Sequence, residues 1–188
     1  MRATHIVVCC YGYLYNRTLA ELAGYQGYLE GVANLLFEKA AELEDPCVDR
    51  VDAIFCGGET LKGFGSESEE IVKHLVSKYY FNKTGGLRIF CEKESLNTEQ
   101  NIARALELIG HVDSFDQVII VCDAVRQIRV QISAKIIARY LGLNQNPRVV
   151  GIPRQDIHPQ SRFWYQLLTA FRFFFNSGLV LRRAGLIK

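Results

Sequence analysis

One short run constrains the fold of this chain more than any other part of its sequence. Residues 117–122 (Gln-Val-Ile-Ile-Val-Cys) are almost continuously apolar. A strand that is apolar on both faces is typical of a parallel sheet with helices packed on each side. Further strand-length runs occupy residues 6–9, 51–56, 87–90 and 148–152. Helical patterns separate these runs, so the sequence predicts a doubly wound, Rossmann-like three-layer α/β/α domain with a mainly parallel five-stranded sheet.

The predicted helices are marked by apolar residues at helical spacing and by capping residues at their starts. The first helical pattern runs from Tyr28 to Leu43, and Asp45-Pro46 ends it. At three later helix starts a side chain can accept a backbone N–H. These capping residues are Ser66 with Glu69, Asn97 with Gln100, and Asp123.

A wide apolar stripe distinguishes the C-terminal helical segment, about residues 159–183. Its members are Phe163, Trp164, Leu167, Leu168, Phe171, Phe174 and Phe175. We expect this stripe to cover one face of the sheet. The alternative is the seam of a homodimer, because so much aromatic area does not ordinarily face water. Arg172 and Asn176 argue against a membrane span.

Length and composition set further bounds. The 188 residues, 49% of them hydrophobic, are enough for one domain (residues 1–188) with a substantial core. A formal net charge of +2 is too small to indicate a nucleic-acid surface. We find neither an N-terminal signal pattern nor an apolar run that could span a bilayer. We therefore expect a cytoplasmic protein that binds no nucleic acid.

The six cysteines lack the C-x-x-C spacing of a redox or zinc motif. Cys9 or Cys10, Cys56, Cys91 and Cys122 each fall near the end of a predicted strand. We interpret them as core residues, because free cysteine is among the most buried residue types. The alternative is a nucleophile or a metal ligand at one sheet edge, and a nucleophile would need a basic partner.

Polar residues gather in the four loops that follow strands, all at the carboxyl edge of the predicted sheet. Ligands bind at this edge in open α/β folds, where several helix N-termini also offer N–H groups to an anion. The candidate ligand-binding residues are Gly12, Asn16 and Arg17 in the first loop, Gly57, Gly58, Glu59, Ser66 and Glu67 in the second, Ser95, Asn97, Thr98 and Asn101 in the third, and Arg126 and Arg129 in the fourth.

The third loop, residues 91–101, carries more polar groups than a helix start needs. Capping uses only the asparagine and glutamine named above. The surplus carboxylates are therefore interpreted as functional, and Glu94 or Glu92 is the candidate general acid or base. Asp123 is the remaining catalytic candidate, because it is the titratable side chain of the fourth loop.

Arg126 and Arg129 lie three residues apart, on one side of the first turns of the fourth predicted helix. Arginines at a helix N-terminus oppose the helix dipole, a small cost that makes sense if an anion lies between them. A solvated helix face, or a salt bridge to Glu94 or Asp123, remains the alternative.

Several of these motifs occur in the order and spacing of a known family. Gly57-Gly58 after an apolar strand, the segment 66–69, the element Ser95-Leu96-Asn97-Thr98-Glu99-Gln100-Asn101 and Arg129 resemble the YdcF/SanA/ElyC-like family (domain of unknown function 218). The resemblance covers about residues 6–152. It implies a Rossmann-like three-layer domain, linked in some members to cell-envelope and lipid-carrier metabolism and in one to S-adenosylmethionine binding.

Two departures from the family pattern bear on function. Arg126 stands where the family usually has a histidine, so a mechanism that uses the histidine as acid or base does not carry over. Envelope members also have an N-terminal membrane anchor. We expect no such anchor here, and an envelope role therefore does not carry over either.

We expect an enzyme that binds a phosphate-bearing, nucleotide-like or activated small molecule and either hydrolyses it or transfers a group. The glycine pair and the helix N-termini would hold the anion, and the two arginines would neutralise developing charge. A non-catalytic module that senses such a ligand is the alternative from a different class. An S-adenosylmethionine-binding protein is a third hypothesis, weakened because residues 10–13 lack a G-x-G-x-G loop.

Mg²⁺ is a candidate cofactor of this site, because carboxylates and phosphate oxygens are its preferred ligands. The carboxylates available at the predicted edge are Glu59, Glu67, Glu92, Glu94 and Asp123. No spacing among them demands a metal.

Overall fold

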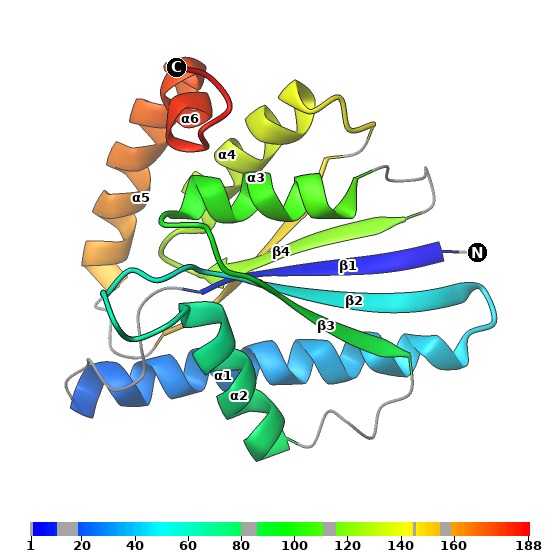
Figure 1. The fold of residues 1–188 in the computed structure, drawn as a ribbon. Helices are drawn as coiled ribbons and strands as arrows, with labels where there is room; N and C mark the ends of the chain where they lie inside the picture. The colour runs from blue at the N-terminus through cyan, green and yellow to red at the C-terminus, as the bar shows by residue number, and fades with distance from the viewer. Residues whose placement is uncertain (1, 11–18, 80–85, 111–115, 145, 155–158) are drawn as a thin grey trace.

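The computed structural model describes residues 2–10, 19–79, 86–110, 116–144, 146–154 and 159–188. Within these ranges, the side chains of residues 19–23, 159–163, 166, 169 and 170 are left out of the description. Figure 1 gives the arrangement of the helices and strands.

Five strands form one sheet in the order β3-β2-β1-β4-β5, and every neighbouring pair is parallel. The strands are β1 (Arg2–Cys9), β2 (Val48–Cys56), β3 (Leu87–Glu92), β4 (Gln117–Asp123) and β5 (Arg148–Ile152). The predicted α/β fold is confirmed, and the sheet of the described residues is parallel throughout. β1 and β2 begin earlier than their apolar runs, because polar residues such as Thr4 and Arg50 also pair in the ladder.

Helices cover both faces of the sheet (Figure 1). On one face lie α1 (Leu19–Ala41) and α2 (Glu67–Tyr79), and on the other lie α3 (Thr98–Ile109), α4 (Gln127–Tyr140) and α6 (Ser177–Arg183). Side chains alternate along a strand, so Ile6 and Val8 pack toward α1 whereas Val7 and Cys9 pack toward α3 and α4. Because both sets are buried, residues 6–9 of β1 and 118–122 of β4 are apolar without interruption.

α5 (Pro159–Phe174) does not cover the sheet, and that expectation was wrong. It packs instead on α4 and α6, because α3, α4 and α6 already occupy that face. Phe173 reaches the core from α5, whereas the outward aromatic side chains of the helix are exposed. No helix among the described residues is long and apolar enough to cross a membrane.

The helical segment expected over about residues 159–183 consists of two helices. α5 ends at Phe174, and Asn176 caps the start of α6, because its side chain accepts a hydrogen bond from the Leu179 N–H at 2.9 Å. This cap turns the chain, and α6 returns to pack against α3 and α4. A short 3-10 helix, Glu42–Glu44, likewise follows α1 before β2 begins.

Gly58 allows two loops at the carboxyl edge to touch through their backbones. Its N–H donates to the Ser95 carbonyl at 2.6 Å. A Cβ atom at this position would lie 2.6 Å from the Lys93 carbonyl oxygen and 2.9 Å from that of Ser95. Gly58 therefore lets the backbone of its loop approach the β3–α3 loop closely, and this contact fixes where the β3–α3 loop lies.

We expect Gly58→Ala to lower the free energy of unfolding by about 1–3 kcal/mol, because the added methyl group meets backbone that cannot rotate away. Gly27→Ala in α1 is the matched control, since nothing lies within 4 Å of the place that its methyl group would take. It should raise the free energy of unfolding by up to about 1 kcal/mol through helix propensity. Urea unfolding of both variants measures the contrast, and equal effects would show that the Gly58 contact is unimportant.

Candidate functional site

The chain reverses its winding direction between β1 and β4, and this is where open α/β sheets bind ligands. α1 follows β1 on one face and α4 follows β4 on the other, which leaves a crevice at the carboxyl ends of these neighbouring strands. A hollow of about 120 Å³ lies there, and we call it the switch-point hollow. It is lined by Cys10, Ser95, Leu96, Asn97, Thr98, Asn101 and Arg126.

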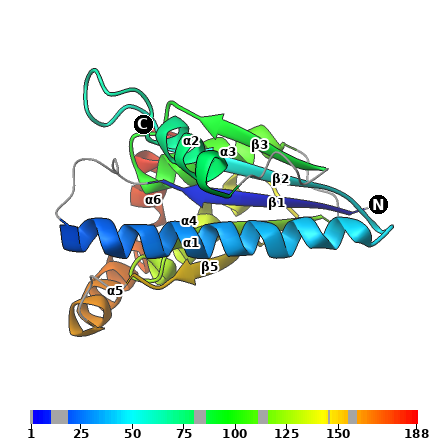
Figure 2. The same ribbon diagram turned by 90° about the horizontal axis from the view of Figure 1, so that it is seen from below.

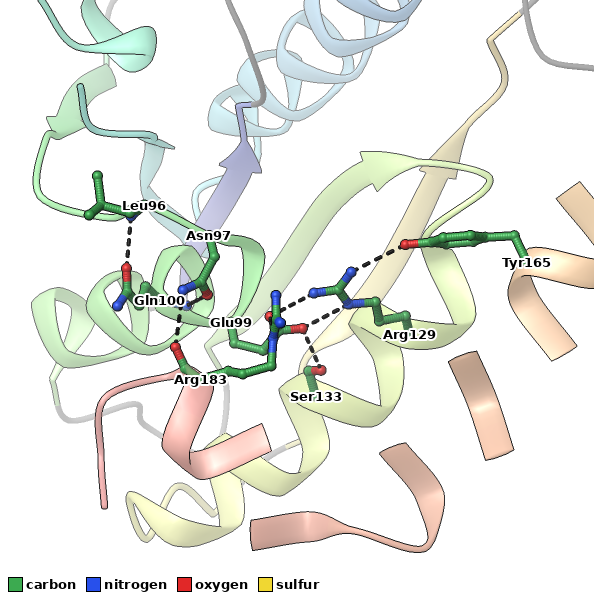
Figure 3. A network of polar contacts seen from close by, with 8 residues as sticks. All are labelled: Leu96, Asn97, Glu99, Gln100, Arg129, Ser133, Tyr165 and Arg183. Carbon is green, nitrogen blue, oxygen red and sulfur yellow. Dashed lines mark hydrogen bonds and ion pairs between the residues drawn. The ribbon is translucent and has the colours of Figure 1, made fainter. Parts of the chain in front are cut away.

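The start of α3 forms one wall of this hollow, and its cap is built as the sequence predicted. Asn97 Oδ1 accepts a hydrogen bond from the Gln100 N–H at 3.0 Å. Gln100 Oε1 in turn accepts from the Leu96 N–H at 2.8 Å, one residue before the position of a standard capping box (Figure 3). Asn97 Nδ2 also donates to the Arg183 carbonyl at 3.2 Å, so the cap ties α3 to α6.

Two buried side chains of the hollow have polar atoms without a hydrogen-bond partner among the described residues. They are Ser95 Oγ and Asn101 Oδ1, in side chains only 2% and 3% exposed. Asn101 Nδ2 donates to the Cys10 carbonyl at 3.4 Å, which orients the amide and leaves its oxygen as a free acceptor. Buried polar groups are normally paired, and both atoms belong to residues that line the hollow, so a ligand or water in the hollow is their candidate partner.

Arg126 forms the wall on the β4 side, and Asp123 contacts it from outside the lining of the hollow. Asp123 Oδ1 accepts from the Arg126 N–H at 3.0 Å, and its Oδ2 lies 3.6 Å from Arg126 Nε. The predicted helix cap at Asp123 is therefore wrong: Asp123 closes the turn that precedes α4, and the helix begins four residues later at Gln127 without a side-chain cap among the described residues. Arg126 lines the hollow, with its charge partly balanced by this buried carboxylate.

The two carboxylates of the third loop have different environments, and neither lines the switch-point hollow. Glu92 is buried, and its Oε1 accepts from the N–H groups of Glu94 and Ser95 at 2.8 and 3.1 Å. Glu92 thus positions Ser95. Glu94 is exposed and lies 3.3 Å from Arg104, in a broad shallow depression on the other side of the loop. The expected role of Glu94 as acid or base gains no support from this position.

The candidates of the second loop also lie outside the lining of the hollow. Ser66 Oγ donates to Glu69 at 2.9 Å and accepts from its N–H at 3.3 Å, which forms the predicted cap. Glu59 is exposed and accepts from the Gly63 N–H within a turn. Glu67 is buried, accepts from the Thr60 hydroxyl, and lies against Gly57.

Glu67 nevertheless lies near the hollow, on the far side of Gly57 and Cys10. A Cβ atom on Gly57 would lie 3.0 Å from Cys10 Cβ and 3.4 Å from Glu67 Oε2. Cys10 itself lines the hollow. The Glu67 carboxylate is therefore a neighbour of the hollow behind Cys10. The first-loop candidates Gly12, Asn16 and Arg17 lie outside the described residues.

Arg129 has a different partner from the one expected. Glu99, in the first turn of α3, is fully buried and is bound by two arginines (Figure 3). Arg129 Nε and Nη2 donate to it at 2.8 and 2.7 Å, and Arg183 Nε donates at 2.8 Å. Ser133 Oγ lies 3.5 Å from the same carboxylate, and Tyr165 accepts from Arg129 Nη1 at 3.2 Å. Arg129 thus holds a protein carboxylate and does not line the hollow.

Sequence reasoning missed Glu99 and Arg183 as parts of this arrangement. A glutamate in the first turn of a helix is ordinarily an exposed partner of the helix dipole. The only signal was the family element at residues 95–101, which contains Glu99 without explaining it. Arg183 lies 84 residues away in the sequence, beyond the reach of any local pattern.

The charge of Glu99 depends on its two arginines. Burial alone would raise the pKa of this carboxyl group. The charges and hydrogen bonds of Arg129 and Arg183 outweigh burial and hold the pKa of Glu99 below its ordinary value. Glu99 is therefore ionised in the folded protein at neutral pH.

Cys9, Cys10, Cys56 and Cys122 belong to the core as expected, whereas Cys91 is only partly buried and lies outside it. Burial raises the pKa of the Cys9 thiol to about 12, and it also raises the pKa values of Cys10, Cys56 and Cys122. These side chains stay protonated at neutral pH, so none is an activated nucleophile. Among the described residues, no group of three or more His, Cys, Asp or Glu side chains could hold a metal ion.

A second polar cluster, on the N-terminal half of the sheet, was not predicted. Arg88 binds Asp52 through two hydrogen bonds of 2.6 and 2.9 Å, and His5 Nδ1 lies 3.2 Å from the same carboxylate. Together with Arg50 they line a cavity of about 200 Å³. Burial is the largest cause of the lowered pKa of His5. Because Asp52 already binds the cations, we interpret this cluster as a structural ion pair.

No family model, curated protein or solved structure matches this chain. The resemblance to the YdcF/SanA/ElyC-like family therefore rests on the motifs alone and stays a prediction.

We expect Glu99→Gln to lower the free energy of unfolding at pH 7 by about 3–5 kcal/mol, because two arginines lose their buried countercharge. Since the pKa of Glu99 is lower in the folded state, its contribution is present above the unfolded-state pKa and is lost as pH falls through the folded one. Urea unfolding between pH 7 and pH 3 should show wild type and variant converging as acid is added.

Glu107→Gln is the control for this variant. Glu107 lies on the same helix, is partly exposed, and makes only a 4.0 Å contact with Arg104. It should change the free energy of unfolding by no more than about 0.5 kcal/mol. A Glu99→Gln protein as stable as this control would show that the two arginines do not depend on the carboxylate.

Proposed function

We propose that this chain binds a small phosphate-bearing molecule in the switch-point hollow and acts on it by hydrolysis or group transfer. The observation that carries the proposal is the pair of unpartnered polar atoms, Ser95 Oγ and Asn101 Oδ1, in the wall of the hollow. A buried polar group without a partner lowers stability, and such groups persist where they serve a ligand.

An anionic group fits the cationic side of the hollow. Arg126 lines it, and the residues at the start of α3 bring the positive end of a helix dipole to the same place. Ser95 Oγ can donate a hydrogen bond to a phosphate oxygen. A planar guanidinium can bind the same group through two parallel hydrogen bonds, which supports phosphate or carboxylate as the ligand group.

Asn101 indicates that the ligand, or a water beside it, offers a hydrogen-bond donor. Its free Oδ1 accepts hydrogen bonds only, so it pairs with a donor such as a hydroxyl group or an attacking water. The hollow of about 120 Å³ has room for roughly four water molecules. That space suits one phosphate group and a neighbouring hydroxyl or water, and the rest of the ligand would extend outside it.

Asp123 is the acid or base that we propose, in preference to the carboxylates of the third loop. It is buried and contacts Arg126, so it lies directly behind a residue that lines the hollow, whereas Glu92 is engaged in positioning Ser95. Glu67, behind Cys10, is the alternative carboxylate. Either could accept a proton through a water molecule.

A non-catalytic binding module is the second candidate function. The specific observation in its favour is that no carboxylate lines the hollow among the described residues. A sensing protein needs the anion site without an acid or base. Calorimetric binding against a panel of nucleotides, sugar nucleotides and polyprenyl phosphates, followed by product analysis of any ligand that binds, separates the two functions.

We expect Arg126→Ala to weaken the phosphate-bearing ligand found in that panel by about 1.5–3 kcal/mol, the size of a charge-assisted hydrogen bond. Arg126→Lys should recover only part of this loss, because a point charge cannot reproduce a bidentate contact. Arg104→Ala is the control, since Arg104 pairs with Glu94 outside the hollow. Calorimetry at two salt concentrations tests the series, and equal affinities for all four proteins would remove Arg126 from the site.

Ser95→Ala should weaken ligand binding while leaving the stability of the ligand-free protein unchanged. It removes a hydroxyl that has no partner among the described residues, so the free energy of unfolding of the ligand-free protein should stay within about 0.5 kcal/mol of wild type. Ligand affinity should fall about tenfold, the loss of one hydrogen bond to a charged group.

Ser68→Ala is the matched control for that experiment. Ser68 Oγ donates to the Glu92 carbonyl at 2.9 Å, so its loss should destabilise the protein by about 1 kcal/mol. It should leave the intrinsic affinity near that of wild type. If Ser95→Ala behaved like Ser68→Ala, the Ser95 hydroxyl would be structural and the proposed site would lose its main support.

A further inference from the structure

α5 and the residue that follows it expose a continuous apolar stripe to solvent. Six large side chains lie on the outer side at helical spacing, with exposed fractions from 38% for Leu167 to 77% for Phe175. They are Trp164, Leu167, Leu168, Phe171, Phe174 and Phe175. The rings of Phe171, Phe174 and Phe175 pack on one another, with centroids 5.3 to 6.1 Å apart. Single exposed apolar residues are ordinary, but a joined patch marks a binding surface.

The stripe faces away from the rest of the fold. Figure 2 shows α5 standing out from the sheet and from the other helices. A groove of about 300 Å³ runs beside it, lined by Ile132 of α4 and by apolar side chains of the stripe. The opposite side of α5 is anchored, because Phe173 is buried in the core and Tyr165 accepts a hydrogen bond from Arg129. The anchoring contacts therefore leave the outer side of the helix exposed to solvent.

The charge of the chain is strongly divided, and the stripe lies in the cationic part. Residues 124–188 contain eleven Lys and Arg against a single acidic residue, Asp156. Residues 1–123 contain eleven Lys and Arg against nineteen Asp and Glu. The net charge of +2 is therefore the sum of +10 in residues 124–188 and −8 in residues 1–123. α4, α5 and α6 contain no carboxylate side chain at all.

Cationic side chains of these helices are exposed close to the stripe in the chain. Arg172 lies on α5 itself, between Phe171 and Phe173, and is exposed. Lys135 and Arg139 are exposed on α4, one and two turns beyond Ile132 in the groove. An apolar stripe of Trp, Phe and Leu on a helix with basic neighbours and no acidic ones is the pattern of interfacial membrane binding.

This charge distribution argues against a second copy of the chain on the stripe. Two copies related by a twofold axis would bring the exposed Lys135, Arg139 and Arg172 of both together, without a carboxylate on α4, α5 or α6 to offset them, which opposes association. A nucleic acid would use the cations but would leave the leucine and phenylalanine side chains unburied. A surface with anionic headgroups above an apolar interior uses both features.

We propose that α5, with the adjoining side of α4, binds the surface of membranes that contain anionic lipids. The aromatic stripe enters the boundary between headgroups and acyl chains, and the basic side chains at its sides contact the headgroups. The helix lies on the membrane and does not span it. The inference does not depend on the ligand proposed for the switch-point hollow.

The test is flotation of the full chain with vesicles of pure phosphatidylcholine and of phosphatidylcholine with about 30% phosphatidylserine. The wild-type protein should float with the anionic vesicles and at least tenfold less with the neutral ones. Raising the salt concentration from 0.1 to 0.5 M should reduce binding strongly, because it screens the attraction to the headgroups. Failure of the wild type to float with anionic vesicles at 0.1 M salt overturns the proposal.

Two sets of variants test the apolar and the electrostatic contributions to membrane binding separately. The triple variant Leu168→Ser, Phe171→Ser, Phe175→Ser should lose at least tenfold in binding while its thermal unfolding stays cooperative, since these side chains are already exposed. The control Phe64→Ser, Leu108→Ser removes two exposed apolar residues elsewhere and should float as wild type. Equal flotation of triple variant and control overturns the proposal.

The charge variant Lys135→Glu, Arg139→Glu, Arg172→Glu should lose binding to anionic vesicles. The control variant Lys62→Glu, Lys73→Glu should keep it.

Two further measurements test the other occupants of the stripe. Light scattering after size exclusion tests for a second copy of the chain, and binding of a labelled RNA oligonucleotide tests for a nucleic acid. If the wild type is a dimer and the triple serine variant is a monomer, the stripe binds a second copy of the chain instead. If the wild type binds RNA and the triple serine variant does not, the stripe is a nucleic-acid site. Either result contradicts a membrane role.

Discussion

The buried Glu99 carboxylate is the interaction on which the candidate site depends most. It joins three helices, because Glu99 lies in the first turn of α3 while its partners Arg129 and Arg183 belong to α4 and α6. A carboxylate without solvent is stable only with such partners, and breaking the set leaves unpaired charges inside the protein. The orientation of the first turn of α3 follows from it. This first helical turn places Asn97, Thr98 and Asn101 around the hollow.

The hollow itself combines two contrasting kinds of polar group. Most of the polar atoms around it are used within the protein: Glu92 holds the loop before α3, Asp123 holds the turn before α4, and Asn97 caps its helix. Ser95 Oγ and Asn101 Oδ1, in residues that line the hollow, have no hydrogen-bond partner among the described residues, and neither has the second oxygen of Glu92, Oε2. A rigid frame with a few free groups is what a small-molecule site needs, because the ligand then does not have to order its own binding groups.

The arginine at position 126 sets a limit on the chemistry. A guanidinium does not release its proton in a protein, so Arg126 binds or stabilises negative charge and does not transfer protons. Proton transfer then has to come from a carboxylate behind the wall of the hollow, or does not occur at all. The same sheet edge could thus serve catalysis in a protein with a histidine at this place and ligand binding alone in one without it.

The sequence alone determined the features that depend on neighbouring residues. The apolar runs located all five strands, because a parallel strand is buried on both faces, and the caps at Ser66 and Asn97 formed as predicted. Tertiary structure decided what depends on distant contacts. Glu99 meets Arg183 across 84 residues, and Glu94 pairs with Arg104 outside the hollow although it directly precedes Ser95, which lines it. α5 was expected on the sheet but packs outside it, because helical spacing shows that a stripe is apolar and only packing decides what covers it.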